Sequence, residues 1–249
     1  MKYPPNDHFQ MNLDKYYQYQ KAKINHSLRF FHRQRLDFIF ETICNMQDNK
    51  SDRFVILDAG CGRGANIIRF AQRRIQVVGV DISEEALKQA SSWVKQEGVQ
   101  EYVTLIRGDI MALPFKDESF DFIISSDVLS IASSTELGLT IMTKLLKKDG
   151  TAIIVFPNSN NIFWFCIFLM EKTANVFRIT LPEGNKFERY RYRDFKKYVI
   201  KSGLKIKKVS SVYVVPMLHI SPYNKIESFF RSKYPFKYLG SHIIIEAGK

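Results

Sequence analysis

Short apolar runs and helical patterns alternate along residues 51–157 of this 249-residue chain. Five of the runs have the length of a β-strand. They are residues 54–57, 76–80, 102–106, 120–124 and 151–156. Because these runs are continuous rather than alternating, we expect both faces of the sheet to be covered. The alternation of strands with helices predicts an α/β fold with a mostly parallel sheet.

Local signals place the helices between these strands. Ser83 precedes Glu84 and Glu85, and a hydroxyl cap followed by acidic residues is typical of the first turn of a helix. Another helix is predicted over residues 136–147, because Asp149 and Gly150 end its pattern. These signals indicate where the chain leaves one strand and returns to the next.

The segments that flank this region have patterns of their own. Apolar residues at helical intervals predict a leading helix within residues 24–47. Near the other end, a helix over 193–202 is followed by a strand with a lysine-rich face at 204–209 and a last strand at 242–246. We therefore divide a single domain into an N-terminal helical cap (1–50), a core (51–157), an insertion (158–192) and a C-terminal part that completes the sheet (193–249).

The positive charge of the chain is unevenly distributed. Basic residues outnumber acidic ones by 37 to 25, a formal net charge of +12. Residues 178–249 hold 16 basic and 5 acidic residues, whereas residues 51–177 hold 13 and 15. The charge therefore favours an anionic partner for the C-terminal part alone, with a solvated lysine-rich surface as the alternative.

The cysteines and the first residues of the chain limit the classes of protein to which it can belong. Cys44, Cys61 and Cys166 show neither CxxC nor Cys/His spacing, so we predict no metal site and no disulfide scaffold. The first residues lack the apolar run of a signal peptide. A cytoplasmic protein is the expectation.

Candidate chemistry is concentrated where the strands end. Asp58 opens a turn that contains Gly60, Gly62 and Gly64, and such a turn lets a ligand approach the backbone closely. Asp81 ends the second strand, where an acidic side chain accepts hydrogen bonds from ribose hydroxyls. This combination predicts a ligand that contains a nucleoside.

Two nucleoside ligands fit this turn. Gly60, Gly62 and Ala65 also satisfy the dinucleotide fingerprint, so NAD is one of them. However, Asp58 suits a ligand with an ammonium group and would repel a pyrophosphate. Asp109, after the third strand, is placed to accept a hydrogen bond from an adenine amino group. These features favour S-adenosylmethionine.

Five motifs in order resemble those of the class I S-adenosylmethionine-dependent methyltransferases. They are most similar to the type 11 branch, which acts on small molecules and quinone-type lipids. The resemblance covers about residues 55–157. The motifs are Val55-Ile56-Leu57-Asp58-Ala59-Gly60-Cys61-Gly62-Arg63-Gly64, Val78-Gly79-Val80-Asp81-Ile82-Ser83, Gly108-Asp109-Ile110-Met111-Ala112-Leu113-Pro114-Phe115, Ser119-Phe120-Asp121-Phe122-Ile123-Ile124-Ser125 and Leu145-Leu146-Lys147-Lys148-Asp149-Gly150-Thr151.

The resemblance implies a Rossmann-like seven-stranded sheet with helices on both faces, whose last strand, 241–246, runs antiparallel. It also implies the roles of the site residues. The methionine part of the cofactor would be held by Asp58 and the turn of Gly60, Cys61, Gly62 and Gly64. The ribose would be held by Asp81, and the adenine would contact Ile82, Asp109 and Ile110. The methyl group would lie beside Ser126 and Asp127.

One departure from the family pattern concerns the catalytic base. Relatives often carry Glu-Val-Leu-x-His-Ile after the fourth strand, whereas this chain has Asp127-Val128-Leu129-Ser130-Ile131 and no histidine. A base is needed only when the acceptor starts protonated. Asp127, by position, and His219 are then the candidates, and His8, His26, His32 and His242 are not singled out.

The predicted function is in-line methyl transfer from S-adenosylmethionine to a small-molecule or lipid-like acceptor. An NAD-dependent oxidoreductase, an RNA methyltransferase and a non-catalytic binding protein of the same fold are the alternatives. Nucleic acid is the less favoured partner, although cations and aromatic residues interleave at 189–193 as in single-strand binders. The oligomeric state is not predicted.

The insertion contains a nine-residue apolar run, Ile162 to Met170. This run is too short to cross a bilayer, which takes about 20 residues. It is interpreted as a buried lid helix over the acceptor site, as an apolar wall for the acceptor, or as an anchor at a membrane interface beside the basic segment. The last of these predicts peripheral contact with an anionic membrane.

Overall fold

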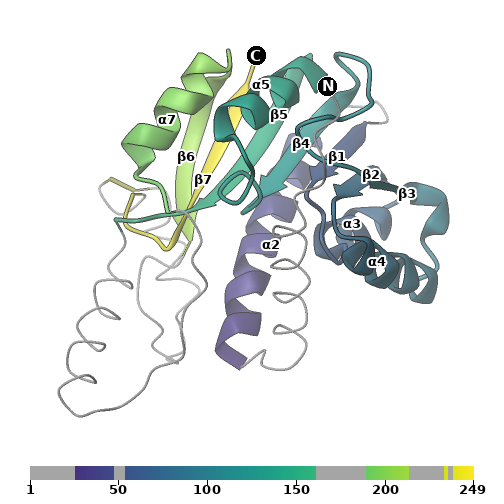
Figure 1. Ribbon diagram of the computed structural model, residues 1–249. Helices are drawn as coiled ribbons and strands as arrows, with labels where there is room; N and C mark the ends of the chain where they lie inside the picture. The colour runs from purple at the N-terminus through teal and green to yellow at the C-terminus, as the bar shows by residue number, and fades with distance from the viewer. Residues whose placement is uncertain (1–25, 48–53, 161–188, 213–232, 235–237) are drawn as a thin grey trace. The chain divides into compact units, whose positions relative to one another are not determined.

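A computed structural model describes residues 26–47, 54–160, 189–212, 233–234 and 238–249 (Figure 1). The helices are α2 (His26–Gln47), α3 (Ala65–Ala71), α4 (Glu84–Gln96), the short 3₁₀ helix η1 (Gln100–Tyr102), α5 (Thr135–Leu145) and α7 (Tyr192–Lys201). The strands are β1 (Val55–Ala59), β2 (Gln76–Asp81), β3 (Val103–Arg107), β4 (Phe120–Ser126), β5 (Leu146–Pro157), β6 (Lys205–Val212) and β7 (His242–Gly248).

The strands form one seven-stranded sheet in the order β3-β2-β1-β4-β5-β7-β6. β1 is parallel to β2 and β4, and β2 is parallel to β3. β7 is inserted between β5 and β6 and runs antiparallel to both. The predicted fold class, a mostly parallel sheet with flanking helices and an antiparallel last strand, is confirmed.

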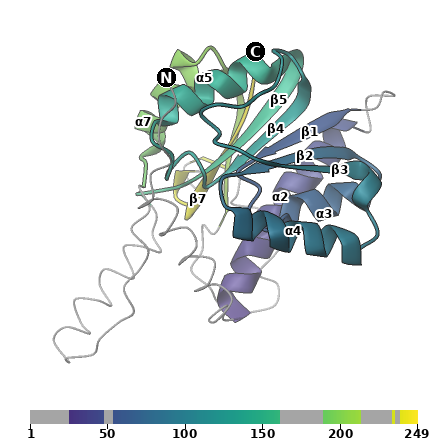
Figure 2. The same ribbon diagram turned by 45° about the vertical axis from the view of Figure 1, so that its right-hand side comes forward.

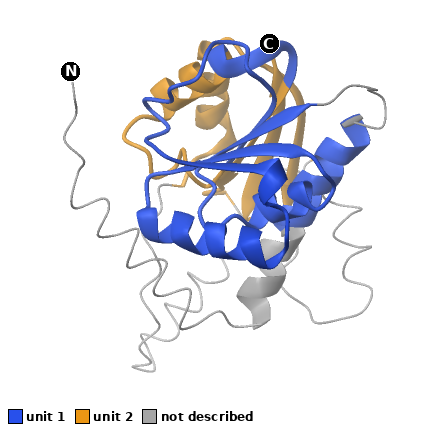
Figure 3. Cartoon of the chain, turned by 90° about the vertical axis from the view of Figure 1, so that its right-hand side faces the viewer, with its two compact units in different colours: residues 1–125, 144–150 blue, residues 126–143, 151–249 orange. Residues whose placement is uncertain are grey.

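The chain divides into two compact units (Figure 3). The first comprises residues 1–125 with 144–150, and the second comprises residues 126–143 with 151–249. The predicted insertion, including the apolar run, lies largely outside the described residues. The predicted division into cap, core, insertion and C-terminal part therefore stays a prediction.

In the first unit, helices pack against the parallel strands. α3 contacts β2, α4 contacts β2 and β3, and the leading helix α2 contacts α3 (Figure 2). The rings of Phe40 on α2 and Phe70 on α3 lie 5.2 Å apart, and Ile39 and Ile43 are fully buried. The helix predicted within residues 24–47 thus exists and is anchored by its apolar face.

The second unit has an aromatic core beside its antiparallel strands. Phe195 on α7 stacks on Phe156 of β5, with ring centroids 3.8 Å apart and planes 11° apart. Tyr190 packs edge-on against Phe195 at 5.4 Å. These contacts hold α7 at the carboxyl end of β5, where Asn158 is completely buried.

One predicted boundary differs from the structure. The helix expected over 136–147 ends at Leu145, and β5 begins at Leu146. The side chain of Lys147 pairs instead with Asp121 of β4 at 2.9 Å, and the backbone carbonyl of Lys144 accepts a hydrogen bond from Glu118 N–H. The ion pair with Asp121 and the pairing within the sheet override the local helical preference of Lys147.

No helix within the described ranges is long and apolar enough to span a bilayer. In the same ranges, histidine, cysteine and acidic side chains form no cluster suited to a metal ion.

Candidate functional site

The turn after β1 is built on glycines with left-handed backbone. Gly60, Gly62 and Gly64 have φ angles of 84°, 53° and 83°, which residues with a Cβ rarely adopt. The N–H groups of Gly60 and Cys61 both donate to the carbonyl of Val80, at 2.7 and 2.9 Å. The turn is thereby tied to the end of β2. Since these N–H groups are used within the protein, the turn offers a ligand close approach rather than those donors.

Asp58 places a buried charge at the end of β1. The residue is 1% exposed, and neither carboxylate oxygen has a hydrogen-bond partner of good geometry among the residues that the structure describes. Burial is the main reason why the pKa of Asp58 is raised to about 7; a side-chain hydrogen bond with Asn66 and the charge of Arg35 lower this pKa in part, and the charge of Asp81 adds to the rise. A buried carboxylate without a partner is unfavourable, so this position fits a ligand that brings a positive charge and N–H donors.

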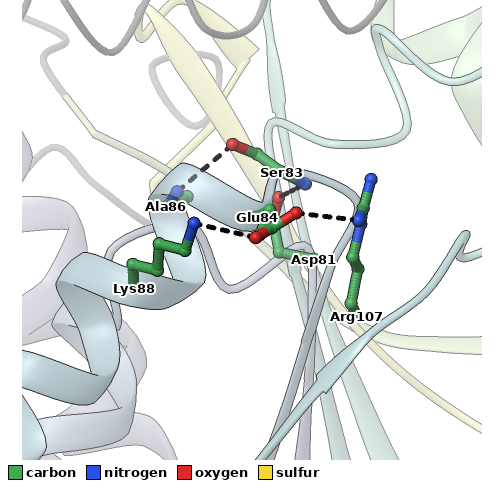
Figure 4. A network of polar contacts seen from close by, with 6 residues as sticks. All are labelled: Asp81, Ser83, Glu84, Ala86, Lys88 and Arg107. Atoms are coloured by element: carbon green, nitrogen blue, oxygen red, sulfur yellow. Dashed lines mark hydrogen bonds and ion pairs between the residues drawn. The ribbon is translucent and has the colours of Figure 1, made fainter.

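Asp81 is buried as well, but each of its carboxylate oxygens accepts a backbone hydrogen bond, and Figure 4 shows the one from Ser83. It accepts hydrogen bonds from the N–H groups of Gly62 at 2.7 Å and Ser83 at 2.9 Å. Burial raises its pKa, and these backbone hydrogen bonds lower it in part. Asp81 therefore links the glycine turn to the start of α4, and its orientation is fixed.

The start of α4 holds this arrangement in place. Ser83 caps the helix through its hydroxyl, which accepts from Ala86 N–H at 3.2 Å, as the sequence predicts. Glu84 lies between Lys88 and Arg107 in Figure 4, at 2.8 and 2.9 Å from their nitrogens. Arg107 ends β3, so its ion pair with Glu84 connects the start of α4 to the carboxyl end of β3.

The remaining residues predicted to bind adenosine lie at the same sheet edge. Gly108 N–H donates to the backbone carbonyl of Asp81 at 3.0 Å. Asp109 is exposed and accepts a hydrogen bond from Met111 N–H at 2.9 Å, whereas Ile110 is buried and Ile82 is half-buried. The first unit thus brings together all predicted cofactor residues except Ser126.

Cys61 has a packing role in this turn and is not a reactive thiol. Its side chain is buried, and burial together with the charges of Asp58 and Asp81 raises the pKa of its thiol well above its usual value. A thiol in this state stays neutral and is a poor nucleophile. Its sulfur would lie 3.0 Å from a Cβ at Gly79, so it helps to fill the space between α3 and β2.

Ser126 and Asp127 belong to the second unit, directly after β4. The Ser126 hydroxyl is buried and makes no hydrogen bond with any residue that the structure describes. Asp127 has a φ of 63° and lies 3.5 Å, Oδ1 to Nε2, from His242. His219, the other predicted base, lies outside the described residues.

His242 is a neighbour of Asp127 that the sequence did not predict. Asp127 and His242 are 115 positions apart, so no local spacing joins them. The available signal was topological: the first residue of an antiparallel last strand lies at the edge where the other strands end. An imidazole at that position was therefore a candidate.

Fold and site together define a class of protein. The sequence profile of a family described as "Methyltransferase domain" matches residues 50–193, more than half of the chain. The chain belongs to this family. This match and the order of the strands confirm the resemblance to the class I S-adenosylmethionine-dependent methyltransferases.

Individual relatives match to different extents. The ubiquinone biosynthesis O-methyltransferase of Rhizobium etli is 28% identical over 198 residues, which cover 76% of this chain and 78% of that protein. The phosphatidylethanolamine N-methyltransferase of Cereibacter sphaeroides is 29% identical over 100 residues, 40% of this chain and 49% of that protein. Matches to the first four curated relatives span only 37% to 49% of their lengths.

Solved structures share the fold. The magnesium protoporphyrin IX methyltransferase of Synechocystis, solved with bound S-adenosylhomocysteine, superposes with a TM-score of 0.64 at 19% identity. The superposition covers 97% of this chain and 95% of that one. At this identity the likeness supports the arrangement of helices and strands.

Proposed function

We propose that this chain transfers the methyl group of S-adenosylmethionine to a small-molecule or lipid-like acceptor by in-line displacement. The observation that carries this proposal is the buried carboxylate of Asp58, whose oxygens make no hydrogen bond of good geometry with the described residues, beside a glycine turn locked to a second buried carboxylate, Asp81. A positively charged ligand with a ribose supplies the partners that this arrangement lacks.

Each residue of the first unit then has a defined task. Asp58 accepts hydrogen bonds from the ammonium group of the methionine part, and the glycine turn lets that part approach the backbone. Asp81, already fixed by two N–H donors, accepts the ribose hydroxyls with its remaining lone pairs. Ile82 and Ile110 give apolar contact to the adenine, with Asp109 at its rim.

Catalysis rests mainly on position. When bound, S-adenosylmethionine supplies a methyl group that its positively charged sulfur already activates. The chain has to hold the acceptor in line with that methyl group, and such positioning is worth about 7–11 kcal/mol. Ser126 and Asp127, which follow β4, are proposed to lie beside the reacting groups, with Asp127 as the base.

The class of acceptor is supported by the relatives. The ubiquinone-biosynthesis enzyme aligns over three quarters of this chain, beyond the cofactor-binding region. The phosphatidylethanolamine enzyme aligns over a shorter part. Both names describe lipid-related acceptors, and the apolar run 162–170 is proposed to form part of the wall that receives a similar molecule.

An assay of methyl transfer tests this function. The purified protein is incubated with methyl-tritiated S-adenosylmethionine and an organic-solvent cell extract, and labelled products are identified by mass spectrometry. We expect label in an extractable product, and a loss of at least roughly 100-fold in Asp127→Ala, the scale of a general base. Absence of transfer with intact cofactor binding would instead favour a non-catalytic protein of this fold.

An NAD-dependent oxidoreductase is the less supported alternative. The glycine spacing permits a dinucleotide, but a pyrophosphate would meet the buried Asp58 carboxylate. The antiparallel β7 also departs from the all-parallel order of dinucleotide-binding sheets. Preferential binding of NAD over S-adenosylmethionine would reverse this choice.

We also propose that the outer face of α7 makes peripheral contact with an anionic membrane. This face presents exposed cationic residues together with Ile200, which is 55% exposed. A basic helix face with an exposed apolar residue suits the interface of a charged bilayer. The cationic residues are Arg193, Lys196, Lys197 and Lys201.

A further inference from the structure

Three polar side chains of the second unit meet at the edge of the sheet where β5 and β6 end. His242, the first residue of β7, is paired with Pro157 and Val212, the last residues of β5 and β6. Its Nε2 lies 3.5 Å from Asp127 Oδ1, and its Nδ1 lies 3.0 Å from the Ser241 hydroxyl. The Asp127 and His242 side chains are 24% and 13% exposed, so the group is partly shielded but reachable.

The chemistry of the three groups gives their contacts a direction. A carboxylate can only accept, so the imidazole nitrogen that faces Asp127 carries the proton. The other nitrogen then accepts from the Ser241 hydroxyl, which is buried. With this tautomer the Ser241 hydroxyl faces Nδ1 at 3.0 Å and the Val212 carbonyl at 3.5 Å, while Nε2–H faces Asp127 Oδ1 at ion-pair distance, outside hydrogen-bond geometry.

The backbone around Asp127 is held on both sides. Asp127 has a φ of 63° in the left-handed region, its N–H donates to Val155 at 3.0 Å, and its carbonyl accepts from the Ser130 hydroxyl at 2.9 Å. Asp adopts this conformation more readily than most residues, and Arg74 and Glu118 share it, so it fixes the backbone here without by itself marking a function. Since the backbone is fixed, the side chain of His242 is one neighbour that can influence the direction of the carboxylate.

We propose that His242 is a positioning residue that orients Asp127 as a proton acceptor, and that the methyl acceptor is a hydroxyl group. This inference rests on the proposed function. It supplies, from β7, a histidine for the site that lacks one after β4.

The carboxylate of Asp127 disfavours amine and carboxylate acceptors and suits a hydroxyl. An ammonium group would form a stable pair with the carboxylate and keep its lone pair protonated, a carboxylate acceptor would be repelled, and a tertiary amine has no proton to lose. A hydroxyl keeps a lone pair for attack while it donates its proton to Asp127. The O-methyltransferase relative, which aligns over most of the chain, is consistent with this class.

Atoms and charges balance in the proposed methyl transfer with the groups named above. The acceptor oxygen forms a bond to the methyl carbon while its O–H proton passes to Asp127. The electron pair of the broken carbon–sulfur bond stays on the sulfur, whose positive charge is thereby removed. Asp127 afterwards returns the proton to water.

The first test examines the pair without any acceptor. Nitrogen-15 NMR of histidine-labelled protein at pH 8, with the His242 signal assigned by its loss in His242→Gln, reports which ring nitrogen carries the proton. We expect the Nε2–H tautomer, and a shift of this resonance in Asp127→Asn. An Nδ1–H tautomer, or a resonance indifferent to Asp127→Asn, overturns the proposal.

The second test compares variants in the transfer assay with the organic extract and tritiated cofactor. His242→Leu should lower kcat roughly 10- to 100-fold with an unchanged KM for S-adenosylmethionine, because a misdirected base costs rate rather than cofactor binding. His242→Gln, which keeps a donor near the Nε2 position, should restore most of kcat. Ser210→Ala, equally buried on β6, is the matched control and should behave as the wild type.

The outcomes separate this inference from the function on which it rests. Equal loss in His242→Gln and His242→Leu, or no loss in either while Asp127→Ala is inactive, contradicts the positioning role alone. Label recovered as an N-methyl or S-methyl group contradicts the hydroxyl acceptor. Absence of transfer in the wild type contradicts the proposed function itself, while the NMR test still decides whether the pair exists.

Discussion

At the scale of single residues, the site is governed by the buried charge of Asp58. Its pKa rises from 3.8 to about 7 chiefly because burial disfavours the ionised form. A carboxyl whose folded pKa exceeds its unfolded value contributes stability that is complete below about pH 4 and is lost as the pH rises through 7. The cofactor-free protein therefore carries an unfavourable charge above neutrality.

This charge predicts that Asp58→Asn stabilises the cofactor-free protein at pH 8. The gain is at most about 4 kcal/mol, from the pKa difference between the folded and unfolded states. It should be much smaller at pH 5. Chemical denaturation at both pH values measures it, with the exposed Asp117→Asn as control. A variant that is less stable at pH 8 would show that Asp58 has favourable partners in the cofactor-free state.

The same group predicts how cofactor affinity depends on pH. Binding the ammonium group requires an ionised Asp58, and at pH 6 only about one tenth of the carboxyl groups are ionised if the pKa is 7. The dissociation constant for S-adenosylmethionine should therefore fall roughly 10-fold between pH 6 and pH 8. In Asp58→Asn, binding should be weaker and this dependence absent. An equal slope in wild type and variant would assign the effect to another group.

At the scale of the elements, the packing of α3 on β2 depends on a missing side chain. A Cβ at Gly79 would collide with Ile67 Cδ1 and lie 3.0 Å from Cys61 Sγ and 3.1 Å from Leu105 Cδ2. We expect Gly79→Ala to destabilise the protein by about 1–3 kcal/mol, the usual cost of overpacking, and to weaken cofactor binding by displacing the turn. Gly108→Ala, whose Cβ would be 3.4 Å from Val80, is the control for stability.

The strands and the glycine turn were predictable because their signals are local. Continuous apolar runs located β1, β2 and β4 to within a few residues, and Ser83 marked the start of α4. The end of α5 was not predictable, since Lys147 turns to Asp121, 26 positions away. The contact of Asp127 with His242 depends on the antiparallel placement of β7, which composition and spacing do not encode.

At the scale of the whole molecule, the excess positive charge and the residues predicted to bind the cofactor lie in different parts of the sequence. The net charge of +12 comes mostly from residues 178–249, whereas the cofactor residues lie in the segment with a slight acidic excess. The basic excess is therefore expected to act on an acceptor or a surface. Cofactor binding should change little when that charge is reduced.

The membrane proposal predicts salt-sensitive binding to vesicles of phosphatidylcholine with 30% phosphatidylserine. Each cation near such a surface contributes about 1 kcal/mol, so Lys196→Glu with Lys197→Glu should abolish binding at physiological salt. Lys95→Glu with Lys88→Glu on α4 is a matched control with equal charge change. Binding to single-stranded RNA but not to vesicles would favour nucleic acid, and binding to neither would leave α7 as a solvated face.

The central claim is that the Asp58–Gly64 turn and Asp81 bind S-adenosylmethionine. Isothermal titration calorimetry of the purified chain with S-adenosylmethionine, S-adenosylhomocysteine and NAD tests it most directly. We predict dissociation constants in the micromolar range for the first two, a loss of about 100-fold or more in Asp81→Ala, no change in Asp117→Ala, and no binding of NAD. Failure of the wild type to bind S-adenosylmethionine, or binding that Asp81→Ala leaves unchanged in a folded protein, would contradict it.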